Sequence, residues 1–141
     1  AVVDPLLGVG EQRGAGREVL RDVTGAQHRA AADDPAAALE RNVAPLPRGS
    51  YRLLALPAER ALAELARQAA RFDLVFADPP YSWVPDAGFL AACSLLLRSG
   101  GVLTIEHSAR SALPASAGDL VRTDSRRYGE SALAFYGKTE F

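Results

Sequence analysis

The sequence predicts an α/β protein built around a mostly parallel β-sheet. Strand-like and helix-like segments alternate along the 141 residues, which is the pattern of such folds. Residues 72–77 (FDLVFA) form a short apolar run of the kind found in central strands that are buried on both faces. Residues 58–70 carry apolar side chains at helical spacing. A chain of this length is sufficient for one hydrophobic core, so we expect a single domain over residues 1–141.

The first half of the chain is expected to contain two strands, a glycine-rich loop and three helices. Glycine favours turns, so the stretch 4–16 is expected to be a loop. Pro35 suits the first turn of a helix, with Asp33 or Asp34 as its cap. The expected elements are the end of a strand at 1–3, helices through Val19 and Leu20, at 35–44 and at 58–70 (buried face Ala58, Leu62, Leu65 and Ala69), and a strand at 51–56.

The second half is expected to continue from the central strand into a helix, a strand and a hairpin. The helix covers residues 86–97 and is expected to stop at the glycines of Ser99-Gly100-Gly101. A strand follows at 102–106. Two further strands, at 120–124 and 132–136, flank the turn 128–131, so we expect an antiparallel hairpin at the sheet edge.

The composition is that of an ordinary globular protein, with 48% hydrophobic and 23% charged residues. The net charge of -1 excludes a nucleic-acid binder that acts through bulk charge, so any RNA-binding surface would be local. A single cysteine, Cys93 in an apolar run, excludes a disulfide framework and a cysteine-based metal site, and we expect it in the core. No signal peptide or membrane-spanning run is evident, so we predict a cytoplasmic protein. We expect it to be a monomer.

The tetrapeptide Asp78-Pro79-Pro80-Tyr81 is the strongest candidate for a reactive site. It follows the central strand, and ligands of α/β sheets bind beyond the carboxyl ends of strands. The two prolines stiffen the turn and leave carbonyls to accept hydrogen bonds. A planar group with an exocyclic amine could donate to the Asp78 carboxylate and the Pro79 carbonyl while it stacks on Tyr81. The alternative is a rigid loop in which Asp78 caps a helix.

The glycine loop is the second candidate. Asp4 ends the first expected strand, and Gly8 and Gly10 follow in a pattern that lets a nucleoside cofactor approach the backbone. An acid at Asp33 or Asp34 would then bond the ribose hydroxyls. A plain helix cap at these two residues is the alternative.

Three segments resemble the RsmD-type 16S rRNA (guanine-N2)-methyltransferases. Residues 72–81 (FDLVFADPPY) resemble the motif IV of that family, 96–107 (LLRSGGVLTIEH) its next strand, and 126–136 (RRYGESALAFY) its terminal hairpin. The match covers residues 58–136, and residues 1–57 match more loosely. Asp at position 78 and the YGES turn favour guanine over other amine substrates.

The resemblance implies a Rossmann-like class I fold with a seven-stranded sheet and a C-terminal antiparallel hairpin. It implies methyl transfer from S-adenosylmethionine to the N2 amine of a guanine in 16S rRNA, free or in the small ribosomal subunit. Asp78, Pro79, Pro80 and Tyr81 would then hold the guanine. The cofactor would be bound by Asp4, Gly8, Gly10 and an acid at Asp33 or Asp34. No metal is implied.

The first loop departs from the family pattern. The family reads D-L-F-x-G-S-G-A-L-G there, whereas residues 4–16 read DPLLGVGEQRGAG. The third strand ends in Leu56-Pro57 where the family has Asp, and we expect the chain to lack the family's basic N-terminal segment. A single inserted C in the gene would convert the family's first residues into those seen here, and sequencing the source locus tests that frame-error hypothesis. An amino-methyltransferase acting on adenine or another amine, and an inactive remnant of the fold, remain the alternatives.

Three arginines lie close together near the expected hairpin: Arg122, Arg126 and Arg127. They could contact RNA phosphates. They could equally form a solvated edge that discourages strand pairing.

Overall fold

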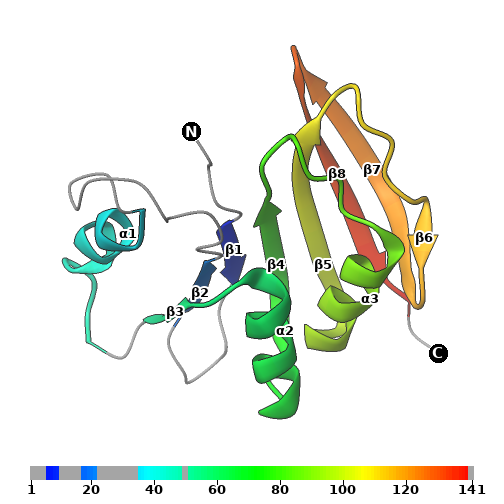
Figure 1. The fold of residues 1–141 in the computed structure, drawn as a ribbon. Helices are drawn as coiled ribbons and strands as arrows, with labels where there is room; N and C mark the ends of the chain where they lie inside the picture. Colours follow the sequence, from blue (N-terminus) through cyan, green and yellow to red (C-terminus); the bar gives the residue numbers. More distant parts are fainter. Residues whose placement is uncertain (1–5, 10–16, 22–34, 49–50, 140–141) are drawn as a thin grey trace.

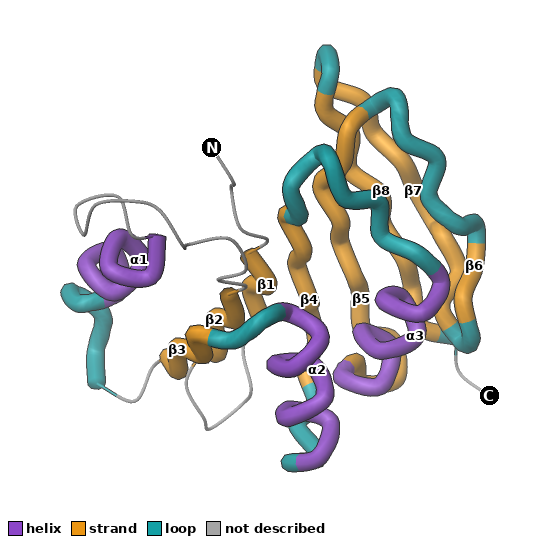
Figure 2. Tube along the Cα trace, viewed as in Figure 1, coloured by secondary structure: helices purple, strands orange, loops and turns teal. Residues whose placement is uncertain are grey.

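The computed structural model describes residues 6–9, 17–21, 35–48 and 51–139. They form an eight-stranded sheet in the order β3-β2-β1-β4-β5-β8-β7-β6, and α2 and α3 cover one face of its middle (Figures 1 and 2). Within these residues no helix combines the length and the hydropathy needed to cross a membrane. The elements are β1 (Leu6–Val9), β2 (Arg17–Arg21), α1 (Pro35–Val43), β3 (Tyr51–Ala55), α2 (Ala58–Arg67), β4 (Phe72–Asp78), α3 (Ala87–Leu96), β5 (Leu97–Ser108), β6 (Ser116–Ala117), β7 (Leu120–Tyr128) and β8 (Ser131–Lys138).

The parallel pair β4 and β5 forms the centre of the fold. Val75 lies opposite Leu103 and Ala77 opposite Ile105. All four side chains are fully buried, because they point toward α2 and α3. The prediction of a central strand over residues 72–77 is confirmed, and the strand brings Asp78 to its carboxyl end.

Helix α3 begins as predicted, but it does not end at the glycines. The Asp86 carboxylate caps its first turn by accepting the Phe89 N–H at 2.9 Å. The helix ends at Leu96, β5 begins at the next residue, and Gly100 (φ 72°) lies inside that strand. The predicted glycine stop is wrong because Lys138 satisfies the helix end instead: its ammonium donates to the carbonyls of Ser94 (2.8 Å) and Leu97 (3.1 Å).

Replacing Lys138 with methionine should therefore destabilise the protein. The ammonium side chain is 19% exposed and also pairs with Asp119 at 3.4 Å, so its loss leaves two carbonyls and a carboxylate without this donor. Hydrogen bonds to charged groups contribute about 1.5–3 kcal/mol each, and we expect a net loss of about 2 kcal/mol in the free energy of unfolding. Urea denaturation measures it. Arg110→Met, which breaks an ion pair whose side chains are 85% and 86% exposed, is the matched control and should change little.

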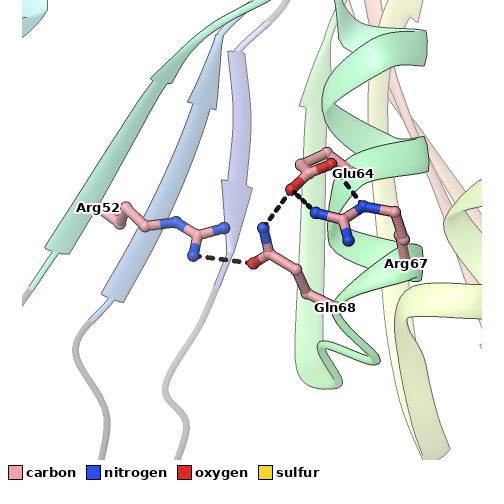
Figure 3. Close-up of polar contacts among 4 residues, drawn as sticks. All are labelled: Arg52, Glu64, Arg67 and Gln68. Atoms are coloured by element: carbon pink, nitrogen blue, oxygen red, sulfur yellow. Dashed lines mark hydrogen bonds and ion pairs between the residues drawn. The ribbon is translucent and has the colours of Figure 1, made fainter.

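Helix α2 has the predicted amphipathic character. Ala58, Leu62 and Leu65 are buried as expected. Ala69 is not, because the helix has already ended there and the residue adopts φ 55°. A polar network connects the C-terminal end of α2 to β3 (Figure 3). In this network Arg52 donates to Gln68 at 3.0 Å, and both Gln68 and Arg67 donate to Glu64. The hydrogen bonds from Arg67, and then that from Gln68, lower the pKa of Glu64 to about 2.

The C-terminal strands pair antiparallel across the turn at 128–131. Tyr128 lies opposite Ser131, and Gly129 occupies the left-handed region (φ 63°), which glycine adopts without strain. Strand β8 also pairs antiparallel with β5. The expectation that this hairpin forms the sheet edge needs a correction, because the two-residue β6 pairs with the outer side of β7.

The N-terminal third differs most from expectation. Residues 6–9 are a strand instead of part of a loop, and residues 17–21 are a strand instead of a helix. Strand β2 pairs with β1 on one side and β3 on the other. Such pairing on two sides satisfies the backbone of a short segment whatever its local propensity. Helix 35–44 and strand 51–56 are confirmed within one residue, whereas the segment 1–3 lies outside the described residues.

The described sheet is therefore mixed and has eight strands, so neither the predicted seven strands nor a mostly parallel order is confirmed. Of its seven strand pairings, only β2–β3 and β4–β5 are parallel. The core lies between the sheet and helices α2 and α3, and it includes Cys93, which is fully buried as predicted. Burial raises the pKa of the Cys93 thiol.

Candidate target-base site

Two carboxylates lie at the carboxyl ends of the central parallel strands. Asp78 ends β4, and the pairing of Ala77 with Ile105 places Glu106 of β5 beside it, with backbones about 4.8 Å apart. Ala77 and Ile105 point into the core, so Asp78 and Glu106 point to the opposite sheet face. Partial burial, and then the negative charge of Glu106, raise the pKa of Asp78.

The prolines form a turn that is anchored to α3. The Trp83 N–H donates to the Pro80 carbonyl at 2.9 Å, and the Trp83 ring packs edge-on against Phe89, with centroids 5.0 Å apart. The Pro80 carbonyl is therefore engaged, which corrects the expectation that both proline carbonyls are free. In the described part of the chain no hydrogen bond reaches the Pro79 carbonyl. One backbone acceptor thus remains beside Asp78 on a rigid turn.

Tyr81 is fixed at its hydroxyl and open at its ring. The hydroxyl donates to Oε1 of Glu106 at 3.2 Å and contacts Oγ of Ser131. Tyr81 as a whole is nevertheless 46% exposed. Figure 1 shows why these contacts form: the loop after β4 and the β7–β8 turn lie at the same end of the sheet. The result is an aromatic platform whose orientation is set by two neighbouring strands.

Glu106 and Ser131 are the site residues that sequence reasoning missed. Glu106 could have been found, because it comes at the carboxyl end of the next parallel strand, where ligands of such sheets bind. Ser131 carries no local signal. It reaches Tyr81 only because β8 pairs with β5, which sets Ser131 opposite Ser108.

Of the predicted cofactor residues, the structure describes only Gly8. Asp4, Gly10, Asp33 and Asp34 lie outside the described residues. Gly8 lies inside β1, opposite Val19 of β2 and Phe76 of β4. A residue between two paired strands does not form the loop that a nucleoside cofactor approaches, so Gly8 does not fit that part. Among the described side chains no group of three or more metal-binding residues is present either.

The three arginines near the hairpin are engaged within the protein. Arg122 donates to the Leu113 carbonyl at 3.3 Å, and Arg127 donates to the Gly129 carbonyl at 2.9 Å. Arg126 pairs with Asp124 at 2.9 Å and lies over the Phe135 ring. These contacts are to exposed or neutral groups, so the arginines remain candidates for phosphate contacts.

Comparison with known proteins places this chain in a family. The family described as "Conserved hypothetical protein 95" matches residues 19–137. A Bacillus subtilis (strain 168) protein named "Putative rRNA methyltransferase YlbH" is 35% identical over 83 residues, which are 57% of this chain and 45% of the relative. The chain thus spans about half the length of that curated relative.

Solved structures of similar proteins have the same overall fold. A conserved hypothetical protein from Streptococcus pyogenes superposes with a TM-score of 0.61 and 28% identity, over 74% of this chain and 64% of the other. "Putative methyltransferase yhhF" from Escherichia coli gives a TM-score of 0.57 at 19% identity, over 77% and 59%, which supports the fold alone. The fold is that of methyltransferases, and the chain belongs to the conserved hypothetical protein 95 family, the RsmD family that its motifs resemble.

Proposed function

We propose that this protein transfers a methyl group from S-adenosylmethionine to the exocyclic N2 amine of a guanine in 16S rRNA. The observation that carries the proposal is the order of groups at the end of β4: the Asp78 carboxylate, then the Pro79 carbonyl, to which no described donor is bonded, then Tyr81, which is 46% exposed. The Tyr81 hydroxyl donates to Glu106 of the neighbouring strand, which keeps Tyr81 at this edge of the sheet. Membership of the RsmD family and the rRNA methyltransferase name of the Bacillus subtilis relative support an RNA substrate.

The site residues would act by holding and orienting the amine. Asp78 and the Pro79 carbonyl accept its two hydrogens, while the base stacks on Tyr81. The nitrogen lone pair then points away from both acceptors, and S-adenosylmethionine supplies an electrophilic methyl group when bound. Positioning of this kind accounts for much of the barrier reduction in two-substrate reactions. The raised pKa of Asp78 makes its carboxylate a better acceptor for the proton that the amine releases.

Identification of the methylated nucleoside tests the proposal. Small ribosomal subunits and naked 16S rRNA are incubated with the protein and labelled S-adenosylmethionine, then digested to nucleosides. We expect labelled N2-methylguanosine. Labelled N6-methyladenosine would instead support the alternative of an adenine amino-methyltransferase, and label on protein would support an amino-acid side chain as the substrate.

One structural observation favours a second candidate, an inactive protein that keeps the fold. Strand β1 runs antiparallel to β4, and Gly8 lies within it instead of in a cofactor loop. Calorimetric titration with S-adenosylmethionine separates the two candidates. Binding below millimolar concentration supports the enzyme, whereas no binding at millimolar cofactor supports the inactive protein.

Removal of the Tyr81 ring should weaken binding of the RNA. Base stacking on an aromatic side chain contributes about 1–3 kcal/mol, so we expect Tyr81→Ala to raise the KM for RNA by about 10-fold to 100-fold. Tyr81→Phe keeps the ring but loses the contacts to Glu106 and Ser131, and it should raise KM by only about threefold. Steady-state kinetics measures both values.

Leu95→Ala is the control for these variants, because Leu95 is 60% exposed at the end of α3, where β5 begins, away from the carboxyl ends of β4 and β5. It should leave KM unchanged. Equal KM values for Tyr81→Ala and Tyr81→Phe would show that the hydroxyl, and not the stacking face, carries the contribution.

A further inference from the structure

We infer that Glu106 is the residue that selects guanine at this site, by accepting the hydrogen on N1 of the base. The inference rests on the proposed function and deepens it. It assigns Asp78 to the exocyclic amine and Glu106 to the neighbouring ring nitrogen. The two carboxylates would then recognise two adjacent donors of one base.

The positions of the two carboxylates suit such a division. Asp78 and Glu106 follow the paired residues Ala77 and Ile105, so they leave the sheet side by side and on the same face. Their charges are close enough for Glu106 to affect the ionisation of Asp78. The spacing of about 4.8 Å between neighbouring strands lets two side chains address separate atoms on one edge of a purine.

Glu106 has acceptor capacity left after its contact with Tyr81. The Tyr81 hydroxyl uses Oε1, and no other described side chain or N–H is hydrogen-bonded to this carboxylate. An ionised carboxylate has two oxygens with about four lone-pair sites. The same Tyr81 that would stack on the base therefore also holds Glu106 in place. A partly buried acceptor beside the stacking platform is left for a ligand donor.

The chemistry of the purines makes this acceptor selective. Guanine carries hydrogens on both N1 and N2 along one edge, so two carboxylates meet two donors. Adenine has an unprotonated N1 beside its amine, and 2-aminopurine has the N2 amine beside an unprotonated N1. A carboxylate facing such a lone pair loses its hydrogen bond and adds repulsion. Sites built to hydrogen-bond a group reject the analogue that lacks it far more strongly than apolar pockets do.

Glu106→Gln tests the recognition of N1 separately from the contact between Glu106 and Tyr81. The glutamine amide oxygen can still accept the hydroxyl of Tyr81, but its NH₂ group can donate to an unprotonated N1. Ser131→Ala is the matched control, because it removes the other partner of Tyr81 without touching a carboxylate. A purely structural role of Glu106 would make both variants slower on every substrate by similar factors.

The experiment compares two short synthetic RNAs that are identical except at one purine position and contain no other guanine. One RNA has guanine there and the other has 2-aminopurine. For the unaltered protein we expect kcat/KM to favour guanine by at least about 100-fold. In Glu106→Gln the preference should fall to about threefold, mainly by loss on guanine. In Ser131→Ala it should stay at the original value.

A retained guanine preference in Glu106→Gln would overturn the inference while the proposed function stands. Binding gives a second readout that needs no turnover, because 2-aminopurine is fluorescent. Titration of the protein into the 2-aminopurine RNA, with the guanine RNA as competitor, should show a guanine preference that Glu106→Gln loses. If neither RNA is methylated but this binding preference and its loss are seen, the proposed function fails and the base selection by Glu106 stands. If the guanine RNA bound no more tightly than the 2-aminopurine RNA in either protein, the base selection by Glu106 would be refuted.

Discussion

Replacing Asp78 with alanine is expected to reduce methyl transfer by at least about 10³-fold. Loss of one preorganised polar group that acts on the reacting atoms costs about 10²–10³-fold, and Asp78 also positions the amine. Cofactor affinity should be unchanged, because Asp78 is assigned to the target base. Single-turnover methylation of 16S rRNA measures the rate, and calorimetry measures the affinity for S-adenosylmethionine.

Asp73→Ala is the matched control. Asp73 is an exposed acid of the same strand, β4, where it accepts two hydrogen bonds from Arg98 at 2.9 Å, at the end away from the site. Its loss should leave turnover within about twofold, since exposed ion pairs contribute little. If Asp78→Ala kept normal turnover, Asp78 would not be the amine acceptor.

The raised pKa of Asp78 gives this residue opposite effects on stability and activity. The folded state binds the Asp78 proton more tightly than the unfolded state, in which the pKa is near 3.8. Stability contributed by Asp78 is therefore lost as pH rises from about 3.8 through the raised value. Activity should rise over the same pH range, because only the ionised carboxylate can take up the proton that the amine releases.

Asp78→Asn separates these two effects. It removes the ionisation, so its melting temperature should exceed that of the unaltered protein at pH 7, and the difference should shrink as the pH approaches 3.8. Turnover should fall at every pH, because the amide oxygen can still accept an amine hydrogen but cannot take up the proton that the amine releases. Thermal melts across this pH range provide the measurement. A difference in melting temperature that did not depend on pH would mean that ionisation of Asp78 is not its cause.

The parts of the fold that the sequence predicts are those with strong local patterns. Helix α2 follows from its apolar spacing, and β4 from an apolar run that ends at a turn. The position of Asp78 at a strand end follows from the same run. The hairpin of β7 and β8 follows from two strand-like segments around Gly129.

The remaining features depend on contacts between distant segments. The contacts of Tyr81 reach 25 residues along the chain to Glu106 and 50 residues to Ser131, and no local spacing encodes them. The end of α3 is set by Lys138, a residue 41 positions beyond Leu97, and not by the glycines nearby. Residues 17–21 have no decisive pattern of their own, so their two neighbouring strands determine their conformation.

Leu103→Ala is expected to have the largest effect on stability. Leu103 is fully buried in β5 opposite Val75, within the core cluster that the sheet forms with α2 and α3. Truncation of a buried leucine to alanine costs about 2–5 kcal/mol, because apolar contacts are lost and a cavity remains. Total stabilities of single domains are about 5–15 kcal/mol, so this one change removes a large share. Urea denaturation followed by circular dichroism measures the loss.

The same substitution also tests whether the central strand pair positions the site. Leu103 and Val75 lie three residues before Glu106 and Asp78, so a cavity between β5 and the helices loosens the pairing that holds both carboxylates at one edge. We expect a fall in kcat beyond the fraction of protein that is unfolded at the assay temperature. Val121→Ala, at a β7 position that is 43% exposed, is the matched control and should change neither stability nor kcat by a measurable amount. Normal kcat per folded molecule in Leu103→Ala would show that the carboxylates keep their positions without tight packing beneath them, and the turn anchored by Trp83 and Phe89 would then be the main support of Asp78.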